Sequence, residues 1–435
     1  MKKATLLLAF AIPLAAFSQS GVLDKMKQKT KARAEQRADE AMDRSIDKAE
    51  NELSGKNKSM TSGEKQESNT ATTAKTPNDQ ASSTHLKSYS RYDFVPGDRI
   101  VYVEDFSQDV VGEFPLKWVT NNRGETVTIE TLPNQWMRLF PASNLASPAL
   151  KKLPENFTLE LDLFLQFSGE GGYVYPELKI KLLELLSSDA HARNYVTNED
   201  AAREVALVLA PGGAGEPLNA ALHSYEKGGT YFTNQSKQLK TLSDNNSKPI
   251  HIALWVQQER IRCWINSDKV FDIPQAIPAG AGFNRLGFSI ESSLYTEDQL
   301  GMYVSNIKLA EGTPDLRSKL MTEGKWTTNG ILFDVNSDRI KPESAGVLRE
   351  IAAVLKENSG VKVKIVGHTD SDGEDKKNLD LSRRRAASIK NALATEFGID
   401  PARMETDGLG ETRPVAENTT KEGKAQNRRV EFIKL

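Results

Sequence analysis

The period of the hydrophobic pattern changes along this chain of 435 residues. In residues 91–311, short apolar runs alternate with polar positions and are separated by clusters of Gly, Pro and Asn. In residues 312–435, such runs are interspersed with stretches in which apolar residues recur every three or four positions. Alternation is typical of a half-buried strand, and the longer spacing of an amphipathic helix. The pattern therefore predicts a mainly β region followed by a mixed one.

Residues 1–18 have the composition of a secretory signal peptide. Lys2 and Lys3 supply the positive charge, a short apolar run follows, and small residues precede a plausible cleavage site before Gln19. The apolar run is too short to span a bilayer. No cysteine lies near the cleavage site, so we expect no lipid attachment there. These features predict export.

The segment between the signal peptide and the β region contains few apolar residues that could form a core. Residues 19–57 are highly charged with a thin apolar line at helical spacing, which predicts a charged helical segment. The pattern does not decide whether that helix dimerises. Residues 58–90 are almost entirely polar and predict a disordered linker. A flexible chain of this length spans roughly 30 Å.

Composition excludes several classes of protein. The formal net charge of −2 argues against a general nucleic-acid binder, which is normally basic. The single cysteine, Cys263, excludes an internal disulfide, and its place in an apolar run predicts a buried, inert thiol. We expect no cofactor and no metal site. No stretch after the signal peptide reaches eighteen uninterrupted apolar residues, so no transmembrane helix is predicted.

Residues 91–311 are predicted to form an all-β sandwich or barrel, because many short strands follow one another closely. The first and last of these strands lie around Val103–Phe106 and Met302–Leu309. In layout the region resembles the concanavalin-like and laminin-G-like jelly rolls, although it carries no diagnostic motif. We therefore expect a jelly-roll-like sandwich.

Residues 312–435 alternate strand and helix signals. Ile331–Phe333 is predicted as a strand, Leu348–Leu355 as part of a helix, and Val361–Ile365 as a half-buried strand. A second helix carries Ala386, Ile389, Leu393 and Phe397 on one face, and strands follow around Met404 and Val430. The order βαβαββ predicts an α+β domain with helices on one side of a sheet.

A set of motifs in this region points to a known family. The motifs are Gly367-His368-Thr369-Asp370, then Asn378, Leu381-Ser382 and Arg385-Ala386, with Gly408-x-Gly410, Asn427-Arg428-Arg429-Val430 and, upstream, Phe333-Asp334-Val335-Asn336-Ser337 and Ile340-Lys341-Pro342. Together they closely resemble the OmpA C-terminal domain family over roughly residues 322–435, about a quarter of the chain. That resemblance implies non-covalent binding of peptidoglycan in the periplasm, at the cell wall or outer membrane.

The resemblance also implies the ligand group and the residues that hold it. Such domains bind the diaminopimelate of peptidoglycan stems, whose free end carries an ammonium and a carboxylate on one carbon. Asp370 is expected to bind the ammonium, and Arg385 to bind the carboxylate through two parallel hydrogen bonds. Asn378 lies seven residues before Arg385 and shares its helix face if the helix begins near 378. Thr369 and, by the family pattern, Arg429 rather than Arg428 complete the predicted site.

Two function classes follow from this combination. In the first, the protein is a non-enzymatic envelope protein whose β region serves as a spacer or binds a glycan or an envelope protein. In the second, it is a glycan or cell-wall hydrolase that the C-terminal domain targets to the wall. Glu160-Leu161-Asp162 begins a laminarinase-type pattern, but the second glutamate of that pattern is missing. The sequence therefore favours the first class; it leaves the ligand of the β region and the oligomeric state open.

Overall fold

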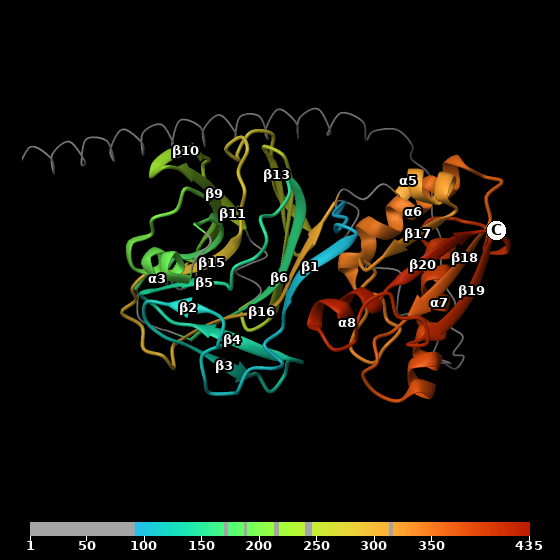
Figure 1. Cartoon of the computed structure of the whole chain (residues 1–435), viewed down its shortest axis with the longest axis horizontal. Helices are drawn as coiled ribbons and strands as arrows, with labels where there is room; N and C mark the ends of the chain where they lie inside the picture. Colours follow the sequence, from blue (N-terminus) through green and yellow to red (C-terminus); the bar gives the residue numbers. More distant parts are fainter. Residues whose placement is uncertain (1–91, 169–172, 187–188, 213–216, 240–245, 313–315) are drawn as a thin grey trace, which may run out of the picture. The chain divides into compact units, whose positions relative to one another are not determined.

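The computed structural model describes residues 92–435, apart from 169–172, 187–188, 213–216, 240–245 and 313–315 (Figure 1). The predicted signal peptide, charged helical segment and linker lie outside the described residues. The described residues belong to one compact unit that covers Asp79–Leu435.

Two antiparallel sheets of eight strands each make up the described part of residues 99–311. The first sheet has the order β14 (Asp268–Ile273), β13 (Arg260–Ile265), β12 (Pro249–Gln257), β6 (Asn156–Phe167), β16 (Leu300–Glu311), β4 (Gln135–Leu139) and β3 (Gly124–Thr128), with β1 (Arg99–Glu104) also paired to β16. The second has the order β10 (Gly229–Thr233), β9 (Leu218–Glu226), β8 (Arg203–Ala210), β7 (Leu178–Glu184), β15 (Arg285–Ile290), β5 (Ser143–Ala146) and β2 (Val119–Thr120), with β11 (Lys237–Leu239) paired to β9.

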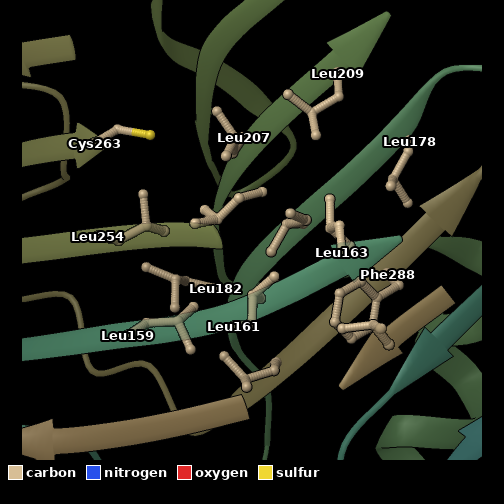
Figure 2. Close-up of a cluster of buried hydrophobic side chains, with 14 of the residues drawn as sticks. Leu159, Leu161, Leu163, Leu178, Leu182, Leu207, Leu209, Leu254, Cys263 and Phe288 are labelled. Carbon is tan, nitrogen blue, oxygen red and sulfur yellow. The ribbon is translucent and has the colours of Figure 1, made fainter. Parts of the chain in front are cut away.

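A single hydrophobic core lies between these two sheets. Leu159, Leu161 and Leu163 point from β6 into the core, where they pack with leucines of β7 and β8 from the other sheet (Figure 2). The residues between them, Glu160 and Asp162, point to the opposite face of their sheet, as the two-residue period of a strand requires. Cys263 is fully buried at the edge of this core, where burial raises the pKa of its thiol, as expected for an inert cysteine.

A helix that the sequence analysis did not predict covers part of the second sheet. Helix α3 (Asp189–Asn198) packs Ala192, Tyr195 and Val196 against Leu183 of β7 and its neighbours. Only these three of its residues are buried, and they fall on one narrow face. Such a short, mostly polar helix has a weak sequence signal, because its stability comes from tertiary packing.

The C-terminal residues form a four-stranded sheet in the order β17 (Lys325–Thr328), β20 (Val430–Lys434), β18 (Val363–His368) and β19 (Met404–Gly410). Between the strands lie α6 (Ala345–Glu357), α7 (Asp375–Thr395) and α8 (Lys421–Asn427). Shorter helical turns are α5 (Leu316–Ser318), η2 (Lys319–Glu323), η3 (Pro342–Ser344) and η4 (Pro401–Arg403). Strands β18 and β19 are parallel, and α7 connects them.

The long helices bury the apolar faces that their sequences predict. Leu348, Ile351 and Leu355 of α6 and Ile389 and Leu393 of α7 join one core with the sheet residues Val363, Ile365 and Phe432. Lys364, between two fully buried residues of β18, is partly exposed. Both amphipathic helices are therefore confirmed. The predicted strand begins only at Val363 and is buried at every position of β18 except Lys364, so it is not half-buried as predicted.

Two details of the predicted order are wrong. Ile331–Phe333 is not a strand: the first strand is β17, and this run makes only an isolated bridge between Phe333 and Ile340. The Ser344 hydroxyl donates to the Leu332 carbonyl and accepts from the Leu332 N–H, so that backbone needs no sheet partner. Of this apolar run, Ile331 is buried, and Leu332 and Phe333 are partly buried. The second difference is helix α8, which lies between β19 and β20 and begins at a Thr420 cap that accepts the Gly423 N–H.

The prediction of a mostly β chain of several sheets, followed by a mixed α and β C-terminal region, is confirmed for the described residues. The predicted domain boundaries stay a prediction. The finer resemblance of residues 91–311 to a concanavalin-like jelly roll stays a prediction.

We predict that Leu161→Ala lowers the free energy of unfolding by about 2–5 kcal/mol, because it opens a cavity between two packed sheets. Leu161 is fully buried. Chemical denaturation monitored by tryptophan fluorescence measures the change. Leu116→Ala is the matched control, since Leu116 is 90% exposed and its replacement is expected to change the unfolding free energy by less than about 0.5 kcal/mol. Equal stability of the two variants would contradict the assignment of Leu161 to the core.

Candidate functional site

Helix α7 lies unusually close to strands β18 and β19. A Cβ atom at Gly367 would lie 2.4 Å from the Ser382 carbonyl oxygen, and one at Gly408 would lie 2.3 Å from the Arg383 nitrogen. Both glycines are needed for this close approach. The Ser382 hydroxyl, which donates to the Leu379 carbonyl, accepts the Gly410 N–H at 2.9 Å. The Gly-x-Gly and Leu-Ser motifs therefore hold the helix against the ends of two strands.

The predicted ligand residues Thr369 and Asp370 directly follow β18, in a loop that α7 shapes. Both residues are buried, and the Thr369 N–H donates to the Gly410 carbonyl at 3.0 Å. Asn378, in the first turn of α7, donates to the carbonyls of Asp370 and Asp372 at 3.3 and 3.1 Å and to Glu411 Oε2 at 2.6 Å. The Asn378 side chain thus holds the loop in place by hydrogen bonds to the loop's backbone carbonyls.

Arg385 lies two helical turns after Asn378 on α7 and is held by the upstream motif. Its Nε donates to the Ser337 carbonyl at 2.9 Å, and its guanidinium carbon lies 4.8 Å from the centre of the Phe333 ring. Burial and the nearby Arg428 lower the pKa of Arg385, while Asp370 acts in the opposite direction. The Phe333–Ser337 motif therefore orients the guanidinium and leaves it partly desolvated.

Asp370 forms its ion pair with Arg428, at 2.5 Å between Oδ2 and Nη1, and forms none with Arg385. Arg429, the predicted site residue, is buried and donates to Glu431 Oε1 at 2.9 and 2.8 Å. Both arginines precede β20, which begins only at Val430. The structure thus brings Arg428, and not Arg429, to Asp370.

A cavity of about 200 Å³ opens beside these groups. Its lining includes the guanidinium-bearing residues Arg385, Arg428 and Arg429 and the ring of Phe333. The other lining residues are Ile100, Lys308, Asn329, Ile331, Leu332, Gly367, His368, Ala425 and Val430. Thr369, Asp370 and Asn378 are not among them. The arrangement offers cations and an aromatic ring to a small anionic group, with the Asp370 carboxylate next to them.

His368 is enclosed in the domain and is tied to the same sheet. Its Nε2 lies 3.6 Å from Glu431 Oε1, which also binds Arg429. Burial opposes ionisation of Glu431, but His368, Lys325 and Arg429 hold the pKa of its carboxyl well below its usual range. Within residues 92–435 as described, no group of His, Cys, Asp and Glu is arranged to bind a metal ion. The geometry agrees with a structural role for His368.

A second charged cluster lies on the outer face of the first β sheet. His251 of β12 places Nδ1 2.8 Å from Asp162 Oδ1 and Nε2 3.6 Å from Glu160 Oε2, and Lys308 Nζ lies 2.7 Å from Glu160 Oε1. Burial opposes ionisation, but the bonds to Asp162 and Glu160 raise the pKa of His251 to about 10. Lys308 and His251 lower the pKa of Glu160 to about 2 despite its burial. Both carboxylates are engaged in ion pairs.

Comparison with known proteins identifies the C-terminal region. Residues 332–428 match the model of the OmpA family. This part of the chain is an OmpA-family domain. Probable lipoprotein YiaD of Escherichia coli is 48% identical over 24% of this chain and 47% of its own length. Outer membrane porin F of Pseudomonas aeruginosa is 40% identical over 23% of this chain and 29% of its own length. The chain thus spans less than half of these curated relatives.

Outer-membrane lipoprotein YfiB of Pseudomonas aeruginosa is 43% identical over 24% of this chain and 61% of its own length. Among solved structures, the peptidoglycan-associated lipoprotein of Burkholderia pseudomallei shares 31% identity, with 24% of this chain and 88% of that chain covered and a TM-score of 0.23. All these matches fall on about a quarter of the chain. The family model and the curated relatives identify this quarter as an OmpA-family domain.

Sequence reasoning missed two residues that shape the site. Asn329 donates through Nδ2 to the Arg428 carbonyl at 2.8 Å, and Arg428 in turn binds Asp370. Arg428 belongs to the Asn-Arg-Arg motif, so the motif contained the signal, but the choice between the two arginines needed the start of β20. Asn329 precedes a glycine in a loop, and no pattern in the sequence relates it to residue 428.

We predict that the free energy of unfolding falls as pH rises from about 6.5 to 10, in part because His251 loses its proton in the folded state. A group whose pKa is higher in the folded than in the unfolded state stabilises the fold at pH values below its unfolded pKa. This stabilisation is lost as the pH rises through its folded pKa. Urea denaturation of wild type and His251→Gln across this range measures the effect, and the variant is expected to show a smaller decline.

His223→Gln is the control for this measurement. Burial lowers the pKa of His223, so its titration lies below the tested range. This variant is expected to keep the decline of the wild type. An identical pH profile for His251→Gln and wild type would refute the assigned role of His251.

Proposed function

We propose that this protein is an envelope protein that binds peptidoglycan non-covalently through its OmpA-family domain. The binding region is taken as residues 322–435, and the β region as residues 91–311. The main support is a set of charged groups from the loop after β18 and from α7: a partly desolvated guanidinium, Arg385, lines one small cavity, and the carboxylate of Asp370 pairs with Arg428, which lines the same cavity. A group that carries both an ammonium and a carboxylate matches this pair of charges.

The proposed ligand group is the zwitterionic end of diaminopimelate. Its carboxylate pairs with Arg385, whose Nε and Nη2 are oriented by the carbonyls of Ser337 and Asp334. Nη1 and the second N–H of Nη2 remain for a two-point contact with the ligand. Its ammonium pairs with Asp370. Thr369 contributes a buried hydroxyl for which the described residues provide no hydrogen-bond partner, and Asn378 keeps the loop in shape. Arg429 supports the cavity wall through Glu431.

The proposed location is the periplasm, in contact with the wall or the outer membrane. Two of the relatives are outer-membrane proteins by name, and this supports the placement. No helix in the described part of the chain is long and apolar enough to cross a membrane. The β region is proposed to act without catalysis, as a spacer or as a binding module for a glycan or an envelope protein. Both carboxylates of the Glu160–Asp162 pair are held in ion pairs, which gives no support to a hydrolase.

We predict that Asp370→Asn and Arg385→Ala each weaken binding to diaminopimelate-containing muropeptides by at least about tenfold. Each variant removes one charge-assisted hydrogen-bonding partner, worth roughly 1.5–3 kcal/mol. Arg385→Lys is expected to fail as well, because an ammonium cannot replace the planar two-point contact. Titration calorimetry on the full chain measures binding, with circular dichroism to confirm folding.

Arg384→Ala is the control for this series. Arg384 neighbours Arg385 in sequence but forms ion pairs with Asp338 and Asp380 on the exposed side of the helix. It is expected to bind like wild type. Normal binding by a folded Asp370→Asn variant would show that the ligand site lies elsewhere. Release of muropeptides from sacculi by the purified protein would instead support the hydrolase alternative.

A further inference from the structure

The carboxylate proposed to bind the ligand's ammonium already has an arginine as its partner. Asp370 Oδ2 lies 2.5 Å from Arg428 Nη1, and Asp370 Oδ1 accepts the Asp372 N–H at 3.2 Å. The Asp370 side chain is only 11% exposed, so few directions remain open to it. An ammonium that approaches Asp370 therefore meets a guanidinium at the same carboxylate.

Arg428 is held in this position by its backbone. It directly follows α8, and Asn329 Nδ2 donates to the carbonyls of Ala425 and Arg428, both at 2.8 Å. Asn427, the preceding residue, is fully buried; its side chain accepts the N–H groups of Val415 and Ala416 and donates to Asn418 Oδ1. The Ser371 N–H, next to Asp370, also donates to Asn418 Oδ1. One hydrogen-bond network thus fixes both the end of α8 and the loop of Asp370.

The other end of α8 is fixed by β1. Lys421 Nζ lies 2.5 Å from Glu104 Oε1, and Glu422 Oε1 accepts the Val103 N–H at 3.1 Å. Ala425 packs with Ile100 and Val103 of the same strand. The helix that carries Arg428 is therefore anchored along its whole length, while the Arg428 side chain itself is 47% exposed. Only the side chain is free to leave Asp370.

We propose that Arg428 is a built-in competitor for the ligand's ammonium group. This inference rests on the proposed function of the site and adds how that site is regulated. In the structure, the positive charge of Arg428 compensates the negative charge of Asp370. A ligand with an ammonium beside its carboxylate displaces the guanidinium toward solvent and pairs with Asp370, while Arg385 takes the carboxylate. A ligand with a carboxylate alone can pair with Arg385 and leave the Arg428–Asp370 pair intact, so the competitor lowers the affinity for zwitterions and not for simple anions.

The test is a titration of the full chain with meso-diaminopimelate, followed by calorimetry. Arg428→Ala removes the competitor and is expected to tighten binding by roughly two- to fivefold, the range that the loss of a half-exposed ion pair allows. Arg428→Lys keeps a positive charge near Asp370 and is expected to bind with an affinity between those of wild type and Arg428→Ala. Thermal unfolding confirms that each variant is folded.

Arg384→Ala serves as the matched control. Its side chain is 45% exposed, against 47% for Arg428, and it also forms ion pairs with aspartates, so it reports the general effect of removing such an arginine. Unchanged or weaker binding by Arg428→Ala overturns the inference, and weaker binding would make Arg428 a ligand contact. Absence of binding by wild type overturns the proposed function itself, and the inference with it. Tighter binding by Arg428→Ala but not by Arg384→Ala supports both.

Discussion

The close contact of α7 with the ends of β18 and β19 is the constraint on which the candidate site depends. At Gly367 and Gly408 the helix backbone approaches the strands so closely that no side chain larger than hydrogen fits. This contact determines where the loop after β18 emerges and which turn of α7 faces it. It therefore sets the positions of Asp370 and Arg385 relative to each other, fifteen residues apart in the chain. A substitution at either glycine would move both charges at once.

The same region shows how buried charge is balanced in this domain. Glu431 accepts hydrogen bonds from Arg429 and lies close to His368, so its charge is compensated beneath the cavity. Asp370 is compensated by Arg428, whose side chain reaches solvent. Because a buried, unpaired carboxylate is unfavourable, Asp370 needs such a partner. The Arg429 side chain is 3% exposed and the Arg428 side chain 47%, and this difference distinguishes a permanent ion pair from the pair that we propose a ligand replaces.

Contacts within the described unit do not follow the order of the chain. Val95, which precedes β1, packs in the hydrophobic core of the C-terminal domain. The Arg349 guanidinium of α6 donates to the Tyr92 carbonyl at 3.0 Å. Strand β1 in turn anchors α8. A domain boundary placed from the periodicity of hydrophobic residues alone misses these contacts. That periodicity shows which face of a segment is apolar, but it does not show which other segment packs against that face.

The sequence by itself determined the class of each region and the family of the last quarter of the chain. The two-residue and three-to-four-residue periods are local properties, and strands such as β6 and helices such as α6 and α7 follow from them directly. The spacing of the glycines, Asp370 and Arg385 is equally local, which is why the motif was recognisable. Tertiary structure alone decided that the backbone of Ile331–Phe333 forms hydrogen bonds with Ser344 instead of joining a sheet. It also decided that α3 and α8 form, and that Arg428 reaches Asp370. Each of these outcomes depends on a partner distant in the chain, and a residue's periodicity does not identify that partner.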